Sequence, residues 1–307
     1  MATASEIKSR IAGVQDTKKI TDAMYMISSV KMRRATKDFE GTVPYFDTLT
    51  EKISQMLGCL PRTESHYFSV PAREACKEKS HGVLLITADK GLAGAYNQDV
   101  LRCCESFMQE HPNTTLFVIG EFGRQYFTNH KLPFRQDFHY SLVSPSLFDA
   151  RKICTELLEY YDSGELDEIS IIYTDYLGAR PGVCRVSTLL PLDKADFRRA
   201  ESAPAEHADK KFLPDAKTVL DGIVPSYVMG YIYGCLVKSF CSEQQSRMMA
   251  MKNAGDNAEE MLRTLKVQYN KIRQATITNE MIEITAGVRA LKRQKTSASG
   301  DLYYDNE

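Results

Sequence analysis

Apolar residues at the start of the chain recur at helical spacing. They form two runs with steps of three or four positions, which are Ile7, Ile11, Val14 and then Ile20, Met24, Ile27. Polar and charged residues occupy the other positions, a pattern typical of an amphipathic helix. We therefore predict an N-terminal helix over residues 1–57, about 75 Å long if some 50 residues are helical. Pro44 is the point at which we expect it to bend or restart.

The pattern changes over residues 78–192, where short apolar runs alternate with helical stretches. The strand-like runs are GVLLIT, TTLFVIG, EISIIYTDY and VCRVSTLLPL, and the helical stretches begin near Asn97, Phe122 and Ser146. Such alternation predicts an α/β domain with a mostly parallel sheet that is covered on both faces. Only LGARPG joins the last two runs, so we expect them to form a hairpin.

A charged, proline-containing linker leads to a second helical segment, residues 213–293. About 100 Å of helix fits between Pro225 and Arg293. Its apolar positions step by three and four in two blocks, which are Leu262, Leu265, Tyr269, Ile272 and then Ile277, Met281, Ile284, Val288, Leu291. One apolar stripe on each terminal helix favours an antiparallel coiled coil between the two. The alternative is a helical bundle folded against the middle domain.

Composition changes this picture little. The chain is 43% hydrophobic and 26% charged with a net charge of −1, so nothing indicates nucleic acid or a membrane surface as a general partner. No uninterrupted apolar run in the sequence is long enough to cross a bilayer, so we expect no membrane span. The N-terminus has no apolar segment, so we expect no signal peptide. Eight cysteines without a C-x-x-C pair and six scattered histidines favour free core thiols and no metal site.

One motif carries candidate chemistry, the stretch ITADKGLAGAYNQD at residues 86–99. It joins a predicted strand to a predicted helix, which is where phosphate-binding loops lie. Gly91 and Gly94, however, fit neither G-x-x-x-x-G-K-[ST] nor G-x-G-x-x-G. We interpret the stretch as a tight structural turn with Asn97 or Asp99 near the start of the helix, and we expect no catalytic residues and no cofactor.

Two long stretches closely resemble the γ subunit of the rotary (F-type) ATP synthase. They are residues 10–35, beginning RIAGVQDTKK, and residues 242–291, beginning SEQQSRMMAMKNAGDN. The glycine turn is similar to the central motif of the same family, and the three parts stand in the family's order. The resemblance implies a Rossmann-like central domain whose long N- and C-terminal helices form an antiparallel coiled coil.

The resemblance also implies a function. A γ subunit is the central rotor shaft that couples ion-driven rotation of the c-ring, by protons or sodium ions, to conformational cycling of the catalytic β subunits in ATP synthesis. The implied partners are three α and three β subunits, the ε subunit and the membrane c-ring. The implied location is peripheral, on the cytoplasmic face of the bacterial cell membrane. No nucleic acid, no direct nucleotide binding and no catalytic site of its own are expected.

Two alternatives belong to other classes of protein. One is a soluble α/β enzyme with a coiled-coil arm, which would use Asp89, Lys90 and the glycine turn to bind a nucleotide. The other is a plain coiled-coil scaffold, which accounts for the helices but leaves the middle domain without a role.

The resemblance assigns contacts to particular residues. The positions expected to contact the β subunit are Arg273, Gln274, Thr278, Glu280, Met24 and Arg247. A basic face expected to lie toward an acidic β loop consists of Lys31, Arg33 and Arg34. Without the resemblance, the charged and polar residues would be interpreted as solvated helix positions and Met24 as a core residue.

The chain continues for 16 residues beyond Leu291, as KRQKTSASGDLYYDNE, a segment that the family pattern does not contain. We predict that residues 294–307 form a disordered tail, because TSASG does not favour a helix. Tyr303 and Tyr304 offer its only sizeable apolar surface.

Truncation after Arg293 is therefore expected to leave assembly and ATP synthesis unchanged, as measured on the complex assembled with the shortened chain. A marked rise in ATP hydrolysis would instead identify the tail as a brake on rotation. Loss of assembly would contradict both interpretations.

Overall fold

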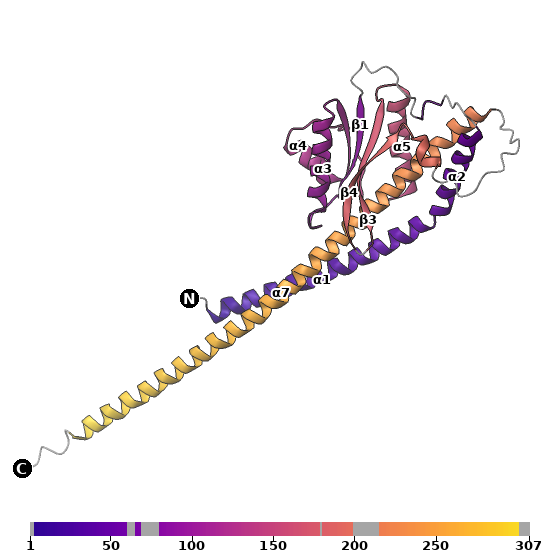
Figure 1. The fold of residues 1–307 in the computed structure, drawn as a ribbon. Helices are drawn as coiled ribbons and strands as arrows, with labels where there is room; N and C mark the ends of the chain where they lie inside the picture. Colours follow the sequence, from indigo (N-terminus) through magenta and orange to yellow (C-terminus); the bar gives the residue numbers. More distant parts are fainter. Residues whose placement is uncertain (1–2, 60–64, 69–79, 179, 199–214, 301–307) are drawn as a thin grey trace, which may run out of the picture. The chain divides into compact units, whose positions relative to one another are not determined.

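The computed structural model describes residues 3–59, 65–68, 80–178, 180–198 and 215–300 (Figure 1). The chain divides into two compact units, one comprising Met24–Ala250 and the other Met1–Ala23 together with Met251–Glu307. Two helices, α1 (Ala4–Glu40) and α7 (Ala216–Gly300), contribute residues to both units.

The predicted N-terminal helix is interrupted. α1 ends at Glu40, and α2 runs over Val43–Cys59. Thr42 closes the break, because its backbone N–H and its hydroxyl donate to Phe39 O at 2.8 and 2.7 Å. Pro44 lies in the first turn of α2, where its missing N–H costs no helical hydrogen bond. The helical segment predicted over 1–57 thus consists of two helices, and of the two outcomes expected at Pro44 the structure has the restart.

A four-stranded sheet in the order β2-β1-β3-β4 forms the centre of the unit Met24–Ala250. Its strands are β1 His81–Ile86, β2 Thr114–Ile119, β3 Glu168–Leu177 and β4 Arg180–Leu190. β1 pairs in parallel with β2 and β3, and β3 pairs antiparallel with β4. The predicted mostly parallel sheet and its final hairpin are both confirmed.

Helices cover both faces of this sheet, as predicted. The helices of the domain are α3 Tyr96–Glu110, α4 Glu121–Asn129, α5 Leu147–Asp162 and the short α6 Lys194–Arg198. α3 and α4 pack on one face, and α5 packs on the other with the first part of α7 (Figure 1). Side chains of β1 alternate accordingly: Val83 and Leu85 join the first cluster, and Leu84 and Ile86 join the second.

The first part of α7 is a core element of the α/β domain. Leu220, Val228, Leu236 and Cys241 are all buried in the cluster that also contains α5. This stretch therefore packs against the domain as the bundle alternative suggested. It also contacts the end of α1, where the ring centroids of Phe39 and Tyr233 lie 6.0 Å apart. α7 also has a stretch apolar enough to cross a membrane by length and composition, with a mean hydropathy of 1.3 and 44% of the stretch buried. A buried core helix meets the same criterion. Charged and polar residues interrupt this stretch, which is why it contains no long uninterrupted apolar run.

The C-terminal end of α7 differs from the sequence-based expectation. We placed the end of the helix at Arg293, with a disordered tail from residue 294, but α7 continues to Gly300. The segment TSASG contains no proline, and extending an existing helix costs far less than nucleating a new one. Residues 301–307 lie outside the described part of the chain.

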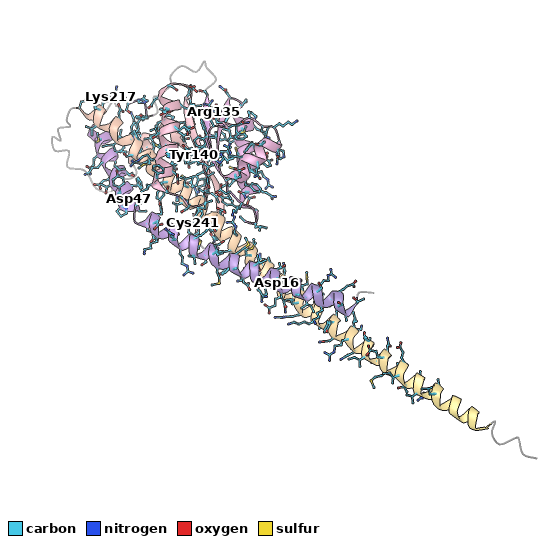
Figure 2. The ribbon with its side chains drawn as sticks, turned by 180° about the vertical axis from the view of Figure 1, so that it is seen from behind. Asp16, Asp47, Arg135, Tyr140, Lys217 and Cys241 are labelled. Carbon is cyan, nitrogen blue, oxygen red and sulfur yellow. The ribbon has the colours of Figure 1, made fainter. Side chains whose placement is uncertain are left out.

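α1 and α7 lie antiparallel, as predicted. In the unit Met24–Ala250, Thr36 Oγ1 lies 3.6 Å from Cys241 Sγ; Figure 2 labels Cys241 on α7. In the other unit, Lys18 Nζ donates to Glu259 Oε2 at 3.0 Å. Residue numbers on α7 thus fall as those on α1 rise, as an antiparallel pair requires.

The apolar stripe predicted on α1 is only partly buried. Ile7 is 4% exposed, but Ile20 is 60% exposed and Ile27 is 57% exposed. The buried positions along this stretch of α1 include Thr21 and Ser28 instead. Ile11, Val14 and Met24 of the stripe are half-buried. Small side chains let helix axes approach closely, so the interface combines part of the apolar stripe with small polar residues.

The second predicted block of α7 has no cover within the described chain. Beyond Leu265, no described side chain of α7 is buried. The exposed apolar residues of this block are Ile277, Met281, Ile284, Val288 and Leu291.

Gly230 of α7 should be required for the packing of α2. A Cβ at this position would lie 2.1 Å from the Phe46 ring. We expect Gly230→Ala to lower the free energy of unfolding by about 1–3 kcal/mol, the usual cost of overpacking. Urea unfolding of the full chain measures this change.

The matched control is Gly222→Ala on the same helix, where a Cβ meets nothing within 4 Å. Alanine's better helix propensity should there raise stability by up to about 1 kcal/mol. Shifts of the same sign in the two variants would contradict the steric explanation.

Candidate functional site

The glycine turn joins the carboxyl end of β1 to α3. Leu92 and Gly94 have positive φ angles of 62° and 58°, so the turn adopts the left-handed conformation twice within three residues. A leucine rarely adopts it, and the Leu92 side chain is 66% exposed. Asn97 Oδ1 accepts a hydrogen bond from Ala88 N at 3.0 Å. This side chain, expected near the start of the helix, therefore ties the two sides of the turn together.

Asp89 holds three chain segments together. Its Oδ1 accepts a hydrogen bond from Glu121 N at the start of α4, at 3.1 Å. Its Oδ2 accepts hydrogen bonds from Leu142 N at 2.8 Å and from the Ser141 hydroxyl at 2.7 Å. Both carboxylate oxygens are thus engaged in structural bonds, which is a different use from the nucleotide binding considered for this residue.

α7 covers the region where ligands bind in related sheets. In open α/β sheets this region lies outside the carboxyl ends of the strands, at the point where strand order reverses. Here Ser239 Oγ of α7 accepts a hydrogen bond from Thr174 N of β3 at 3.1 Å, and Gln245 Nε2 donates to Gly178 O at 2.6 Å. Tyr96, at the start of α3, is buried, and burial raises the pKa of its hydroxyl. Side chains of the protein itself therefore occupy this edge of the sheet.

Arg247 is engaged inside the chain. Its side chain is buried, and its Nη1 lies 2.5 Å from Glu243 Oε1. Its Nη2 donates to Lys90 O at 3.2 Å and to Gly91 O at 3.1 Å. Burial raises the pKa of Glu243, whereas the neighbouring Arg247 acts in the opposite direction. The donors that we expected to face a β loop are thus bound to Glu243 and to the glycine turn.

The other predicted contact residues of α7 are accessible. Thr278 donates its hydroxyl hydrogen to Gln274 O at 2.8 Å, a bond within the helix. All four side chains are exposed: Arg273, Gln274, Thr278 and Glu280.

The predicted basic face of α1 belongs to the unit Met24–Ala250. Lys31, Arg33 and Arg34 are exposed, and Met24 is half-buried. Arg33 Nη2 donates to the Ser29 hydroxyl at 3.0 Å. The charges of this face are therefore directed to solvent.

Exposed apolar residues on the same two helices were missed by sequence reasoning. On α1, Met26 is 67% exposed and Val30 is 63% exposed, and on α7 Met249 is 57% exposed. The sequence contained a signal for this exposure in the consecutive apolar residues Tyr25, Met26 and Ile27. Because successive residues of a helix point in different directions, the three cannot all face one partner.

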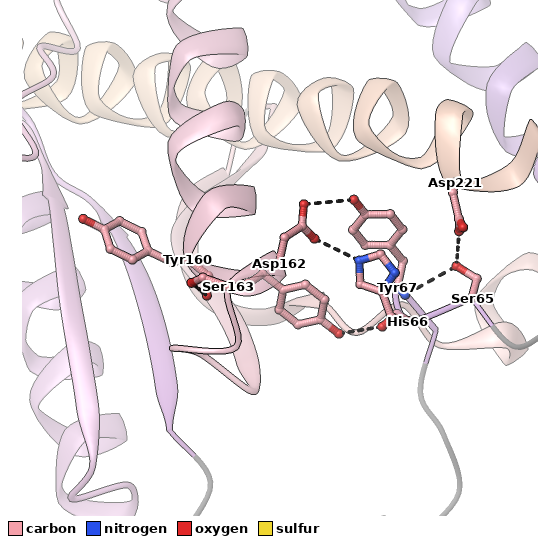
Figure 3. Close-up of polar contacts among 8 residues, drawn as sticks. Ser65, His66, Tyr67, Tyr160, Asp162, Ser163 and Asp221 are labelled. Atoms are coloured by element: carbon pink, nitrogen blue, oxygen red, sulfur yellow. Dashed lines mark hydrogen bonds and ion pairs between the residues drawn. The ribbon is translucent and has the colours of Figure 1, made fainter. Parts of the chain in front are cut away.

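Residues 65–68 form a second feature that the sequence analysis did not predict (Figure 3). In the sequence they lie between the predicted N-terminal helix and the predicted α/β domain. His66 Nε2 lies 2.9 Å from Asp162 Oδ1, and the Tyr67 hydroxyl donates to Asp162 Oδ2 at 3.3 Å. The Ser65 hydroxyl donates to Asp221 Oδ1 at 2.5 Å. Burial and the Asp162 carboxylate raise the pKa of Tyr67 to about 12. These bonds fasten the segment to α5 and α7.

The cysteines that the structure describes are free thiols: Cys103, Cys104, Cys154, Cys184, Cys235 and Cys241. Burial raises the pKa values of Cys104 and Cys154 to about 12, which keeps these thiols protonated and unreactive. Cys59 and Cys76 lie outside this set. Over the described ranges, no three His, Cys, Asp or Glu residues are placed to hold a metal ion.

These features define a class of protein: an α/β domain whose ligand-binding edge is filled by its own long C-terminal helix, paired antiparallel with an N-terminal helix. A family model described as ATP synthase matches residues 3–291. An ATP synthase gamma chain of Ruminiclostridium cellulolyticum is 37% identical over 290 residues, covering 94% of this chain and 98% of that protein. The corresponding protein of Acetivibrio thermocellus is 35% identical over 298 residues, covering 95% of this chain and 100% of that protein.

The solved structures agree on the fold. A chain of the Euglena gracilis mitochondrial ATP synthase superposes with a TM-score of 0.63 at 17% identity, covering 95% of each chain. The chain described here belongs to the ATP synthase gamma chain family. The resemblance found in the sequence is confirmed.

The occupied sheet edge predicts how the chain behaves toward nucleotides. We expect calorimetric titration of the full chain with Mg·ATP to give no stoichiometric binding in the micromolar range, with a nucleotide-binding protein in the same buffer as the control. Stoichiometric binding in that range would favour the enzyme alternative.

Proposed function

We propose that this chain is the central rotor shaft of an F-type ATP synthase. In this role it couples ion-driven rotation of the c-ring to conformational cycling of the catalytic β subunits. The observation that carries the proposal is that α7 is buried in the domain at one end and exposed at the other. One uninterrupted helix is a core element of the α/β domain at Leu220–Cys241, and its apolar residues from Ile277 to Leu291 are exposed. A shaft needs both an anchored part and a part available to a surrounding sleeve.

The exposed block is suited to mechanical contact. A shaft changes the β subunits only if it contacts them unequally, since equal contacts with all three would shift no equilibrium. The apolar residues of this block recur at steps of three and four, so the helix presents different side chains to different sides of a sleeve. Its apolar side chains can pack against a sleeve without the directional hydrogen bonds that would fix one orientation.

The exposed polar residues of α7 are proposed to grip the β subunit. Arg273 and Gln274 can donate hydrogen bonds to carboxylate or carbonyl oxygens of a β loop, and the charge of Arg273 strengthens such bonds. Thr278 and Glu280 lie on the following turn. Their exposure in the chain leaves these groups free for a partner.

The basic face of α1 is proposed to lie toward an acidic β loop. Lys31, Arg33 and Arg34 are exposed, and exposed ion pairs are worth only about 0–1 kcal/mol each. Such pairs can break and form again as the shaft turns. Met24 is half-buried and is proposed to add an apolar contact with the same loop. Arg247 can contact β only if its guanidinium leaves Glu243, or if β reaches the exposed part of the Arg247–Glu243 ion pair.

The remaining parts of the proposal concern surroundings and chemistry. The α/β domain would sit against the ε subunit and the c-ring, and the chain would lie on the cytoplasmic face of the bacterial cell membrane. We propose that it has no catalytic site of its own and binds no nucleotide or cofactor. The structural use of Asp89 and the buried position of Tyr96 support this view.

Replacement of Arg273 and Gln274 together by alanine tests the proposed grip. Hydrogen bonds to charged groups contribute about 1.5–3 kcal/mol, so ATPase turnover of the complex assembled from α, β and this chain should fall about tenfold or more. The thermal unfolding of the chain should not change, because both side chains are exposed.

The control replaces Lys266 and Gln268 by alanine, a cation and a glutamine that are exposed nearby on α7. Equal turnover in the two variants would contradict the assignment of Arg273 and Gln274. Failure of the unmodified chain to copurify with α and β, or to stimulate their ATPase activity, would contradict the shaft function itself.

A further inference from the structure

We propose that Glu243 and Arg247 form a clamp that fixes the glycine turn to α7, and that this clamp carries torque from the α/β domain into the shaft. The proposal rests on the shaft function proposed above. It assigns to Arg247 a positioning role inside the rotor, separate from the proposed contact with β. We call the four residues Lys90, Gly91, Glu243 and Arg247 the turn clamp.

The geometry of the turn clamp uses the planar shape of the arginine side chain. Nη1 lies 2.5 Å from Glu243 Oε1, one helical turn earlier on α7. Nη2 donates to two successive carbonyl oxygens, those of Lys90 and Gly91. Glu243 orients the guanidinium along the helix, and the other nitrogen reaches the turn. A lysine could satisfy Glu243 but has a single nitrogen, which cannot hold all three acceptors in this arrangement.

The turn itself needs to be held from outside. Leu92 has a φ of 62° directly after the two clamped carbonyls, and a non-glycine residue keeps such a conformation only where its surroundings fix it. Asp89 binds the turn to Glu121 of α4 and to Leu142. Arg247 binds the next two residues of the same turn to α7. The turn is therefore tied on one side to the domain and on the other to the long helix.

The position of the clamp along α7 suits the transfer of torque. Ser239 and Gln245 attach α7 to β3 and to the residue that follows it. Among the hydrogen bonds of the described residues, those of Arg247 are the last along α7 that reach the α/β domain. The compact unit that contains the domain ends shortly afterwards, at Ala250.

Burial distinguishes this pair from the other ion pairs of α7. Side-chain exposure is 10% for Arg247 and 6% for Glu243, against 78% and 47% for the Arg263–Glu259 pair. Exposed pairs are screened by water, whereas a buried pair cannot be opened without leaving a charge uncompensated. The turn clamp therefore resists separation in a way that a surface pair does not.

The test compares Arg247→Lys and Arg247→Met with the control Arg263→Met, an exposed arginine on the same helix. Hydrogen–deuterium exchange of the amides at residues 88–95 is measured on the full chain. ATP hydrolysis and ion pumping are then measured on the complete synthase reconstituted in vesicles. Arg247→Met leaves the buried Glu243 without a positive partner, so this variant could fail to fold. Arg247→Lys keeps a positive charge beside Glu243 and therefore tests the loss of the bonds to the turn alone.

We expect Arg247→Lys to speed exchange in the turn about tenfold, the effect of one lost hydrogen bond. Its complex should pump fewer ions for each ATP hydrolysed, and Arg263→Met should change neither the exchange nor the pumping per ATP. Unchanged exchange in Arg247→Lys would overturn the clamp. Faster exchange with unaltered pumping per ATP would overturn its role in torque. A synthase that does not couple even with the unmodified chain would instead contradict the proposed function.

Discussion

The structure depends on the burial of the first part of α7 against the sheet. Leu220, Val228 and Leu236 lie in the same apolar cluster as α5 and the inner residues of β1. Because each turn of an α-helix is joined to the next by its own hydrogen bonds, burial at this end supports the helical conformation of the residues that follow. The exposed block from Ile277 onward is stable as helix only as a continuation of the anchored part, since an isolated helix of that length is marginal in water.

The same packing explains why a fold typical of nucleotide binders is proposed to have no nucleotide of its own. The edge at which doubly wound sheets bind ligands is crossed by α7, which supplies Ser239, Gln245 and Arg247 to the backbone there. Asp89 is used to hold the turn to α4. A common sheet architecture can thus serve a mechanical role, because function depends on the groups placed at a site and not on the fold that carries them.

The pairing of α1 with α7 separates two kinds of surface. Close contact is made by small residues such as Thr21 and Ser28, which are buried. Larger apolar residues such as Met26 and Val30 are turned outward, where they are available to a partner. Exposed charges beside them contribute little energy each, so contacts made there can be exchanged as the partner changes.

Periodicity and turn residues in the sequence were sufficient to predict the alternation of strands and helices, the final hairpin and the antiparallel pairing of the terminal helices. The motifs at residues 10–35 and 242–291 were sufficient to identify the family. Each of these properties is determined by residues that are close together in the sequence. Pro44 likewise marked the position at which α2 begins, although the sequence did not decide between a bend and a restart.

Tertiary structure alone decided which faces are covered. Spacing on α1 indicated that Ile20 and Ile27 share a stripe, but only the partner helix shows that these two side chains face outward. The bonds of Arg247 to Lys90 and Gly91 join residues 157 and 156 positions apart, and those of Ser65 to Asp221 join residues 156 positions apart. No local pattern encodes such a contact. It arises because the order of strands in the sheet and the path of α7 across it bring distant segments together, and that path is set by burial of the whole core.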